Sequence, residues 1–536
     1  MARTLVSAAS RLVSTLFGVP GTAALLLLTP ITSYSASAPL TPQQTRGKQI
    51  YERGESGASR KITVFLGAEE TAVPATVVPC ANCHGADGHS GVTEAGITPP
   101  DITWDHLTKP YGGVTSSGQK RPPYTDRLIR RAVSLGVNSA GQRLFGAMPR
   151  YQMLYTDMDD LLAYLKVLGT VAERGVTDEE VHVGVILPPQ GAMTGAGQAA
   201  RAALSAFFNE LNAGGGIYAR HIVLHSYEPP GAGDPAAGFA TFLDTQPLFA
   251  LVASFLAGAE RPFTTLLRGR GLPLVGAFTL FPQLDQPLNP YVFYFYPGVP
   301  GEAEALIEFA AKQSGNGTVA VVYSSETVFS GAADVAEAAV PQAGAPSPRV
   351  RRFEVTALPT DIARAAKQLA DANPRATLLL LPGATATALI RECAKLKPQY
   401  TLLLPGSLAN ASVLEAAGDL AAPSYFAMPS LPTDAAPEAV EEYRVLAARH
   451  GLPTHDLPAQ WQAIASAQVL VEALKSAGSD LTATRLVAAL EQLHDFAPGL
   501  TASVSFGPNR RVGLSSARIS RLDPATKRLT PAEIVQ

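Results

Sequence analysis

Two cysteines and a histidine lie in one short stretch, Cys80-Ala81-Asn82-Cys83-His84, and are the residues best suited to chemistry. Thiols three residues apart can each add to one vinyl group of a haem, and the adjoining imidazole can then ligate the iron. The alternative is half of a zinc site, which would need two more thiols or imidazoles at matching spacing. The remaining cysteine, Cys393, is far away in a helical pattern typical of a core residue. The motif therefore predicts one covalently attached haem c, held by Cys80 and Cys83, with His84 as an iron ligand.

A haem iron that only carries electrons needs a sixth ligand. Met148 is the first candidate, because a thioether raises the reduction potential and Pro149 fixes the loop that presents the sulfur. If Met148 does not bind the iron, an open coordination position would favour an enzyme. The rival ligands are Met153, Met158, His89 and His106.

The N-terminus has the parts of an export signal. Arg3 and Arg11 are its only charged residues, an apolar segment extends to residue 28, and small residues lie around 33–38. Gly18, Pro20 and Gly21 interrupt the apolar segment, which is shorter than the ~20 residues of a membrane span. We expect residues 1–38 to be a cleaved signal peptide and the mature protein to be periplasmic, where c-type haem is attached.

Composition and length limit the function classes. The chain has 536 residues, which suggests two to four domains. With 46% hydrophobic and 16% charged residues it is typical of a well-packed globular protein. Its net charge is −3 and it contains no run of Lys and Arg, so nucleic acid is not an expected partner.

Two predicted helices frame the haem motif. Thr41, followed by Pro42 and Gln44, predicts the start of the first helix, on which Gly47 and Tyr51 share a face. Residues 156–159 predict the start of the second, whose apolar residues recur at helical spacing up to residue 168. A glycine opposite an aromatic ring would let the two helices cross closely.

Residues 39–170 resemble the class I cytochrome c family. The resemblance is carried by the first helix, the CxxCH motif with its trailing Gly-x-Asp-Gly, the Met-Pro-Arg-Tyr loop at 148–151 and the last helix. It implies an all-α domain with one haem c and electron transfer as its role. It also implies that the carbonyl of Pro99, or of Pro100, accepts the Nδ1 proton of His84. An insertion over 54–79 departs from the family, and its residues 61–66 predict a small strand or hairpin.

The segment that leads to Met148 is basic. Because it contains seven basic residues and one acid, we expect either a positive rim that steers an acidic redox partner or an ordinary solvated helix face. The basic residues are Lys120, Arg121, Arg127, Arg130, Arg131, Arg143 and Arg150.

The second half alternates apolar runs with helical patterns, which predicts an α/β architecture with two parallel sheets. The loops contain none of the motifs GxGxxG, GxSxG, GxxxxGK and HExxH, so we expect a binding protein rather than an enzyme. A helix is predicted at 198–211. The predicted strands are 181–187, 249–253, 273–277, 318–323, 376–381 and 401–404.

Residues 181–536, after a linker at 171–180, resemble the type I periplasmic substrate-binding proteins of the branched-chain amino acid and amide transport class. The resemblance is carried by the strand at 183–188, the segments 209–215 and 271–275, and the helix from Trp461. It implies two α/β lobes, joined by three crossings of the chain, that close on a small organic ligand.

The predicted ligand site departs from that family. Where the family places a serine pair at a helix start to hold a ligand carboxylate, this chain has Leu256 and Ala257. Losing hydroxyl donors puts an amino-acid ligand in doubt and favours a less polar one. The candidate ligand contacts are Ser254, Thr279 and Ser325, with Ser324 and Phe329 as neighbours of the last.

The two halves give one main functional prediction and one alternative. The main prediction is an exported monohaem electron-transfer protein, whose haem domain is tethered to a small-molecule-binding domain and exchanges electrons with a periplasmic dehydrogenase or oxidase. The alternative is the solute-binding component of an ABC-type transport system, with an accessory haem domain and a membrane permease as its partner.

Overall fold

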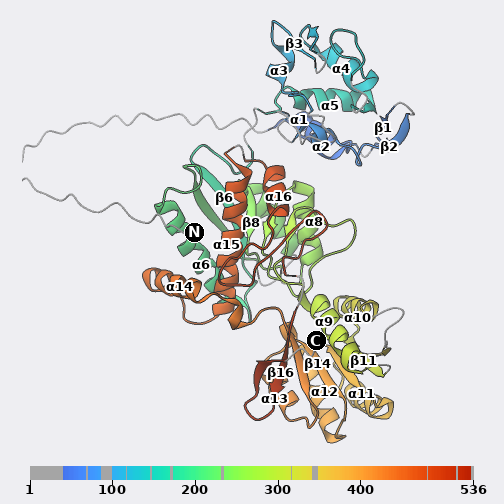
Figure 1. The fold of residues 1–536 in the computed structure, drawn as a ribbon, viewed down its shortest axis with the longest axis vertical. Coiled ribbons are helices and arrows are strands. Elements are labelled where there is room, and N and C mark those ends of the chain that lie inside the picture. The colour runs from blue at the N-terminus through green and yellow to red at the C-terminus, as the bar shows by residue number, and fades with distance from the viewer. Residues whose placement is uncertain are drawn as a thin grey trace, which may run out of the picture.

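The structure is a computed structural model and describes residues 40–532, with gaps at 59, 68–69, 86–87, 89–98, 116–117, 145–147, 170–172, 231–234, 257, 315–316, 341–347, 480 and 515–516. The predicted signal peptide lies outside the described residues. An N-terminal domain is followed by two α/β lobes, and Figure 1 shows lobe 1 between the N-terminal domain and lobe 2. In the described part of the chain, every helix is too short or too polar to span a membrane.

Two helices that pack face to face form the centre of the N-terminal domain, α1 (Pro42–Arg53) and α5 (Tyr155–Leu165). Gly47 lies so close to α5 that an added Cβ would be 2.0 Å from the Asp160 carbonyl oxygen and 2.7 Å from the Tyr164 Cβ. The predicted close crossing of these helices is therefore confirmed, and only a residue without a side chain fits at the crossing point.

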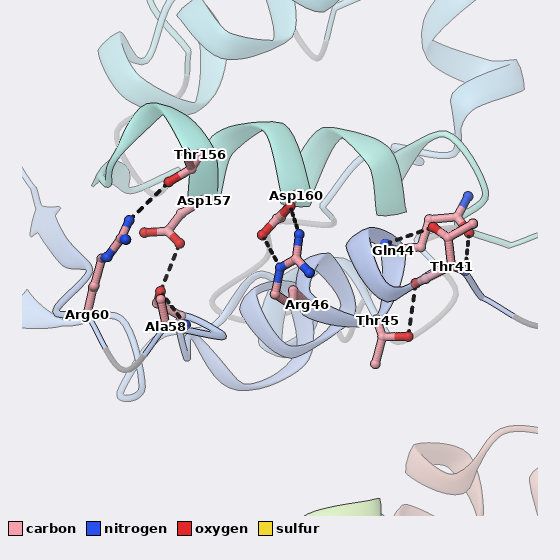
Figure 2. Close-up of polar contacts among 10 residues, drawn as sticks. Thr41, Gln44, Thr45, Arg46, Ala58, Arg60, Thr156, Asp157 and Asp160 are labelled. Carbon is pink, nitrogen blue, oxygen red and sulfur yellow. Dashed lines mark hydrogen bonds and ion pairs between the residues drawn. The ribbon is translucent and has the colours of Figure 1, made fainter.

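Polar contacts fix the start of α1 and its position against α5 (Figure 2). The Thr41 hydroxyl accepts a hydrogen bond from the Gln44 N–H at 3.3 Å, and Gln44 Oε1 accepts from the Thr41 N–H at 2.8 Å, which confirms the predicted capping box. One turn later, Arg46 Nε and Nη2 donate to the two carboxylate oxygens of Asp160 at 2.7 and 2.9 Å. This paired geometry sets the register between the helices.

The N-terminal domain is not all-α, which corrects the prediction. The insertion supplies β1, at the place where a small strand was expected, and β2; both join β5 in an antiparallel sheet of order β2-β1-β5. The strands are β1 (Thr63–Leu66), β2 (Thr71–Pro74) and β5 (Arg150–Gln152), with a separate hairpin of β3 (Gly113–Val114) and β4 (Lys120–Arg121). The remaining helices are α2 (Cys80–His84), α3 (Trp104–Thr108) and α4 (Asp126–Leu135).

Lobe 1 contains a five-stranded parallel sheet in the order β10-β9-β8-β6-β7. Its apolar residues form one cluster with α6, α15 and α16 and another with α7 and α8, so helices cover both faces. The strands are β6 (Glu180–Ile186), β7 (His221–Tyr227), β8 (Ala250–Val252), β9 (Leu274–Val275) and β10 (Val292–Phe293). The helices are α6 (Thr194–Ala213), α7 (Pro235–Thr245), α8 (Glu260–Arg270), α14 (Pro437–His450), α15 (Leu457–Ala477) and α16 (Ala483–Glu491).

Lobe 2 contains a seven-stranded sheet in the order β12-β11-β13-β14-β15-β16-β17. Its first five strands are parallel, and β16 pairs antiparallel with β15 on one side and with β17 on the other. Cys393 is 3% exposed in one of its cores, as predicted. The strands are β11 (Thr318–Ser324), β12 (Arg349–Val355), β13 (Ala376–Leu380), β14 (Thr401–Pro405), β15 (Ser424–Met428), β16 (Arg518–Asp523) and β17 (Arg528–Pro531). The helices are α9 (Gly298–Ser314), α10 (Thr327–Ala338), α11 (Pro359–Ala372), α12 (Gly383–Lys395) and α13 (Ala411–Gly418), with short 3-10 turns η1 (Gly406–Leu408) and η2 (Pro432–Asp434).

The chain passes between the lobes three times, as the resemblance implied. It enters lobe 2 between β10 and α9, returns to lobe 1 between β15 and α14, and enters lobe 2 again before β16. The second and third crossings are joined by an ion pair, because Arg518 Nη2 lies 3.0 Å from Asp434 Oδ1. Three parallel connections of this kind allow two lobes to hinge without separating.

Candidate functional site

The haem motif forms the short helix α2, directly after Pro79. With 3.6 residues per turn, Cys83 and His84 lie about one turn after Cys80, so the three side chains project from neighbouring positions on one side of the helix. The Tyr51 hydroxyl of α1 donates to the Gly85 carbonyl at 2.7 Å, so the central helix pair holds the end of α2 in place.

His84 is 6% exposed, and its Nδ1 lies 3.1 Å from the carbonyl oxygen of Pro100. Of the two carbonyls that the resemblance implied, Pro99 or Pro100, the structure therefore places that of Pro100, and not that of Pro99, at His84. A hydrogen bond from Nδ1 leaves Nε2 as the nitrogen that can bind iron. Burial lowers the pKa of His84, and the Pro100 carbonyl partly opposes this shift.

Cys80 has a partner that the sequence did not reveal. The Tyr151 hydroxyl donates to the Val78 carbonyl at 2.7 Å and is also hydrogen-bonded with the Cys80 thiol. Burial raises the pKa of Cys80 to about 11, with the Tyr151 hydrogen bond acting in the opposite direction. Since Tyr151 lies on β5, directly after Met148 and Pro149, it links the predicted iron-ligand loop to the haem motif.

The rival iron ligands differ in their surroundings. Met158 is 5% exposed in the core, and Met153 packs against the same core, so both are core methionines. His106 lies 3.8 Å from an Asp101 carboxylate oxygen, and His89 is outside the described residues. Met148 is half-buried in the loop before β5 and stays the predicted sixth ligand.

The residues present fit a covalently attached haem. Two half-buried thiols stand on one helix beside an imidazole whose Nδ1 is already engaged. Within the described ranges, no three His, Cys, Asp or Glu side chains gather into a set that could hold a metal ion, so the zinc alternative has no ligand set there.

Much of the basic charge near Met148 is already engaged. Arg130 pairs with Asp159, and Arg150 Nη2 lies 2.8 Å from a carboxylate oxygen of Glu70. Arg121 is 9% exposed and donates to backbone carbonyls. The structure therefore favours an ordinary helix face over a broad positive rim.

The strand order marks where a ligand would bind in each lobe. In open parallel sheets, ligands bind at the carboxyl ends of the strands, where the strand order reverses direction. The order reverses between β6 and β8 in lobe 1 and between β11 and β13 in lobe 2. The carboxyl-end loops of lobe 1 also reach lobe 2, because the Val299 N–H of α9 donates to the Leu280 carbonyl at 2.8 Å.

Ser254 lies at the reversal point of lobe 1, but its hydroxyl is used inside the sheet. It is 0% exposed, accepts from the Ile186 N–H at 3.1 Å and donates to the Val252 carbonyl at 3.3 Å. Ser254 therefore joins β6 to β8, and we remove it from the predicted ligand contacts. Leu256 is also 0% exposed, and Ala257 lies outside the described residues.

Thr279 faces a buried carboxylate. Its hydroxyl donates to Glu260 Oε1 at 2.8 Å, and the Gly258 N–H approaches the same oxygen at 3.3 Å. Glu260 is 6% exposed, begins α8, and has no ion-pair partner among the described residues. The N-terminus of α8 carries a partial positive charge, and the carboxylate of Glu260 lies there. A side chain of the protein itself thus already compensates this charge.

Ser325 lies at the reversal point of lobe 2, in the exposed loop between β11 and α10. Its neighbour Phe329 is 6% exposed and packs edge-to-face on Phe281 of lobe 1, with ring centroids 5.3 Å apart. Of the predicted contacts, Thr279 and Ser325 thus remain candidates in the carboxyl-end loops of the two sheets, and the structure adds Glu260 and an aromatic pair beside them.

Lobe 2 also contains a buried acid that sequence reasoning missed. Glu302 is 0% exposed, and its carboxylate accepts from the Ser407 hydroxyl and from the Ser407 N–H, the latter at 3.0 Å. Burial raises the pKa of Glu302 to about 7, although the hydrogen bonds from Ser407 and Gly406 oppose the shift.

Comparison with known proteins agrees with this architecture. A family model described as periplasmic binding protein matches residues 180–527. The two lobes, three crossings and strand order define a two-lobed binding protein of the periplasmic type. The chain belongs to the periplasmic binding protein family, a family of binding proteins rather than enzymes.

Solved structures share the fold of the two lobes at low identity. An extracellular ligand-binding receptor from Verminephrobacter eiseniae is 18% identical, with 66% of this chain and 99% of that chain covered and a TM-score of 0.52. A fatty acid ABC transporter substrate-binding protein from Thermomonospora curvata is 16% identical, covering 68% and 95%, with a TM-score of 0.52. A branched chain amino acid ABC transporter protein from Thermus thermophilus with bound valine is 16% identical, covering 66% and 96%, with a TM-score of 0.52. A search of curated protein sequences gives no match.

Proposed function

We propose that this protein is the solute-binding component of an ABC-type transport system, which captures a small organic ligand between lobes 1 and 2 and delivers it to a membrane permease. The observation that carries the proposal is the family match over residues 180–527, which spans both lobes and all three crossings. The strand order supports it, since each sheet has its reversal point at one end, where ligands bind in such sheets.

The ligand that we propose lacks a carboxylate at its lobe 1 end. The proteins from Thermus thermophilus and Thermomonospora curvata are described with valine and with fatty acid, which both carry a carboxylate. In this chain, Glu260 already occupies the α8 N-terminus and accepts from Thr279. A ligand carboxylate at this helix end would be repelled by the carboxylate of Glu260. It would also find fewer hydrogen-bond donors, because the Thr279 hydroxyl already donates to Glu260. Neutral or cationic compounds such as amides, alcohols and amines fit this end better.

Thermal unfolding with paired ligands tests this function and the ligand class separately. A true ligand at 100 times its dissociation constant should stabilise the protein by about 2.7 kcal/mol. We expect stabilisation by a neutral or cationic member of a pair and none by its carboxylate analogue. If no small organic compound stabilises the protein, the binding function is wrong; if carboxylates stabilise it best, only the ligand class is wrong.

The variant Glu260→Gln tests the role of the buried acid directly. Removing its charge should improve the binding of carboxylate analogues relative to neutral ones. Asp244→Asn is the matched control, because Asp244 pairs with Arg270 at the other end of α8 and should leave the preference unchanged. Equal preferences in wild type and Glu260→Gln would contradict the proposed role of Glu260.

A second proposed function, one-electron transfer, belongs to the N-terminal domain. The observation that favours it is the turn that presents Cys80, Cys83 and His84, with His84 Nδ1 held by Pro100 at 3.1 Å. When bound, a haem c supplies a one-electron redox couple. Cys80 and Cys83 would anchor it, His84 and Met148 would bind its iron, and a periplasmic dehydrogenase or oxidase would be the redox partner.

Spectroscopy of the purified protein tests this second function. Pyridine treatment should give the spectrum of a haem with two saturated side-chain links, and the ferric protein should be low-spin with methionine ligation. Met148→Ala should abolish the methionine signature, whereas Met153→Ala should keep it. A high-spin wild-type iron that binds carbon monoxide would instead favour an enzyme with an open iron site.

A further inference from the structure

The N-terminal domain contacts lobe 1 through the last turns of α1. Arg53 Nη1 donates to the Gly269 carbonyl at 3.2 Å, and its guanidinium also hydrogen-bonds the Tyr291 hydroxyl. At Gly271, an added Cβ would be 3.2 Å from Arg53 Nη2 and 3.4 Å from the Tyr291 hydroxyl. Arg53 therefore fits between the end of α8 and the residue that precedes β10.

A second charged group on α1 lies at the same border. Lys48 Nζ is 3.7 Å from Glu52 Oε1, and the two side chains are 33% and 23% exposed. Burial lowers the pKa of Lys48, but Glu52, Glu173 and Tyr291 outweigh burial and raise it. Glu173, in the linker before β6, and Tyr291, before β10, therefore lie close enough to the ion pair on α1 to act on Lys48.

All these contacts lie at the end of lobe 1 that is remote from the ligand cleft. Gly269 and Gly271 end α8 just before β9, Tyr291 directly precedes β10, and Glu173 precedes β6. The contact surface is thus formed at the amino ends of the parallel strands, whereas the ligand loops follow their carboxyl ends. Figure 1 shows the same order in space, with the N-terminal domain and lobe 2 at opposite ends of lobe 1.

We propose that Lys48, Glu52 and Arg53 form a built-in docking surface that fixes the N-terminal domain to the amino-end edge of lobe 1, so that both move as one body when lobe 2 closes. Closure of the cleft then leaves the interface unchanged. The N-terminal domain stays accessible to another protein in the open and in the closed state.

Proteolysis and solution scattering of the full mature chain test the docking surface. In the double variant Lys48→Ala/Arg53→Ala, we expect trypsin cleavage at Arg174, which lies at the border, to become about tenfold to a hundredfold faster, as for a lost hydrogen bond to a charged group. The radius of gyration should increase as the domains separate. Arg60→Ala is the matched control, because Arg60 Nη1 bonds Thr156 within the N-terminal domain, and it should behave as wild type. Wild-type cleavage and scattering in the double variant would overturn the proposal.

A cross-link keeps the test valid if the double variant folds poorly. A Cβ added at Gly269 meets no described atom within 4 Å, so Gly269→Cys should be tolerated. Combined with Arg53→Cys, which keeps Lys48 and Glu52 of the docking surface in place, it should give an internal cross-link with a short bismaleimide, at equal yield with and without a stabilising compound. Neither single variant should give it. An absent cross-link, or a yield that changes on ligand binding, would contradict a fixed docking on lobe 1.

Discussion

The haem motif and the ligand cleft are built in different ways. The proposed haem-binding residues Cys80, Cys83 and His84 are neighbours in the chain, and one short helix brings them together. The predicted ligand site instead gathers residues from different elements, as when Thr279, in the loop after β9, meets Glu260 of α8, or Phe281 meets Phe329 of α10. A site made of neighbours is visible in the sequence, whereas a site made by the fold is visible only once the sheets are known.

Removing both cysteines of the haem motif should have the largest effect, and it should leave the ligand-binding lobes unchanged. Cys80→Ala with Cys83→Ala should remove covalently bound haem completely, because each thiol supplies one of the two bonds to the porphyrin. Cys393→Ala is the matched control, since Cys393 is 3% exposed in lobe 2. The haem content per protein chain, measured by absorbance after denaturation, checks this. Full covalent haem content in the double variant would show that the motif has another use.

Close packing in the N-terminal domain should give the next largest effect. Gly47→Val should cost at least about 2–4 kcal/mol of unfolding free energy, because its Cβ would overlap backbone atoms of Asp160 that cannot move aside. Gly331→Ala on α10 is the control: a Cβ there meets no described atom within 4 Å, and alanine favours a helix. Denaturant unfolding measures both variants. A neutral Gly47→Val would show that α1 and α5 do not cross as described.

Much of this fold could be predicted from the sequence, and the misses have a physical cause. The six predicted strands are all found, and each lies inside its sheet, where burial on both faces gives a continuous apolar run. In the two lobes, the sequence did not predict β7, β10, β12, β15, β16 and β17. Of these, β7 and β12 lie at sheet edges and carry polar residues such as His221, His225 and Arg351, which protect an exposed edge but interrupt the apolar pattern of a strand. Strands β15 and β16 lie inside the sheet of lobe 2, so an edge position does not explain why they were missed.

Among the contacts and site residues, too, those that depend on neighbouring residues could be predicted, and those that depend on the fold could not. The capping box at Thr41 and the close approach of Gly47 depend on spacing within one helix, so the sequence could predict them. Ser254 was predicted because it lies just before Leu256 and Ala257, the positions where the family has its serine pair, but residue type does not show that this hydroxyl accepts from the Ile186 N–H. The hydrogen bond between Tyr151 and Cys80 joins distant parts of the chain, and no local pattern indicates it.

A buried acid in the cleft-forming lobe should make stability depend on pH. The Glu302 pKa is raised from 4.5 to about 7, so between these values the folded state binds more protons than the unfolded state. The unfolding free energy contributed by this group is thus fully present below pH 4.5 and is lost as the pH rises through 7, on the order of 3 kcal/mol. Other groups titrate as well, so the informative quantity is the difference between wild type and Glu302→Gln.

That difference should change between pH 4.5 and pH 8 in favour of Glu302→Gln, because the amide keeps the size of the side chain without a charge. Glu304→Gln, an exposed change on the same helix, should follow the wild type at every pH. Chemical unfolding at a series of pH values measures both. Parallel curves for wild type and Glu302→Gln would mean that Glu302 is ionised at the same pH in both states.

Replacing Tyr151 should have the smallest effect. Tyr151 lies on β5, far along the chain from Cys80, so its contact with the haem motif depends on the fold and not on neighbouring residues. Tyr151→Phe should cost about 1–2 kcal/mol of unfolding free energy, since it removes the donor to the Val78 carbonyl and leaves a half-buried acceptor without this partner. Tyr155→Phe is the matched control, because Tyr155 is 71% exposed.

Tyr151 also positions the Cys80 thiol, so Tyr151→Phe should contain a larger fraction of chains with only one sulfur bonded to haem. Intact-mass measurement after reduction can count these chains. A variant with normal stability and two complete bonds per haem would show that α2 holds Cys80 without help from β5, and that the haem site is local throughout.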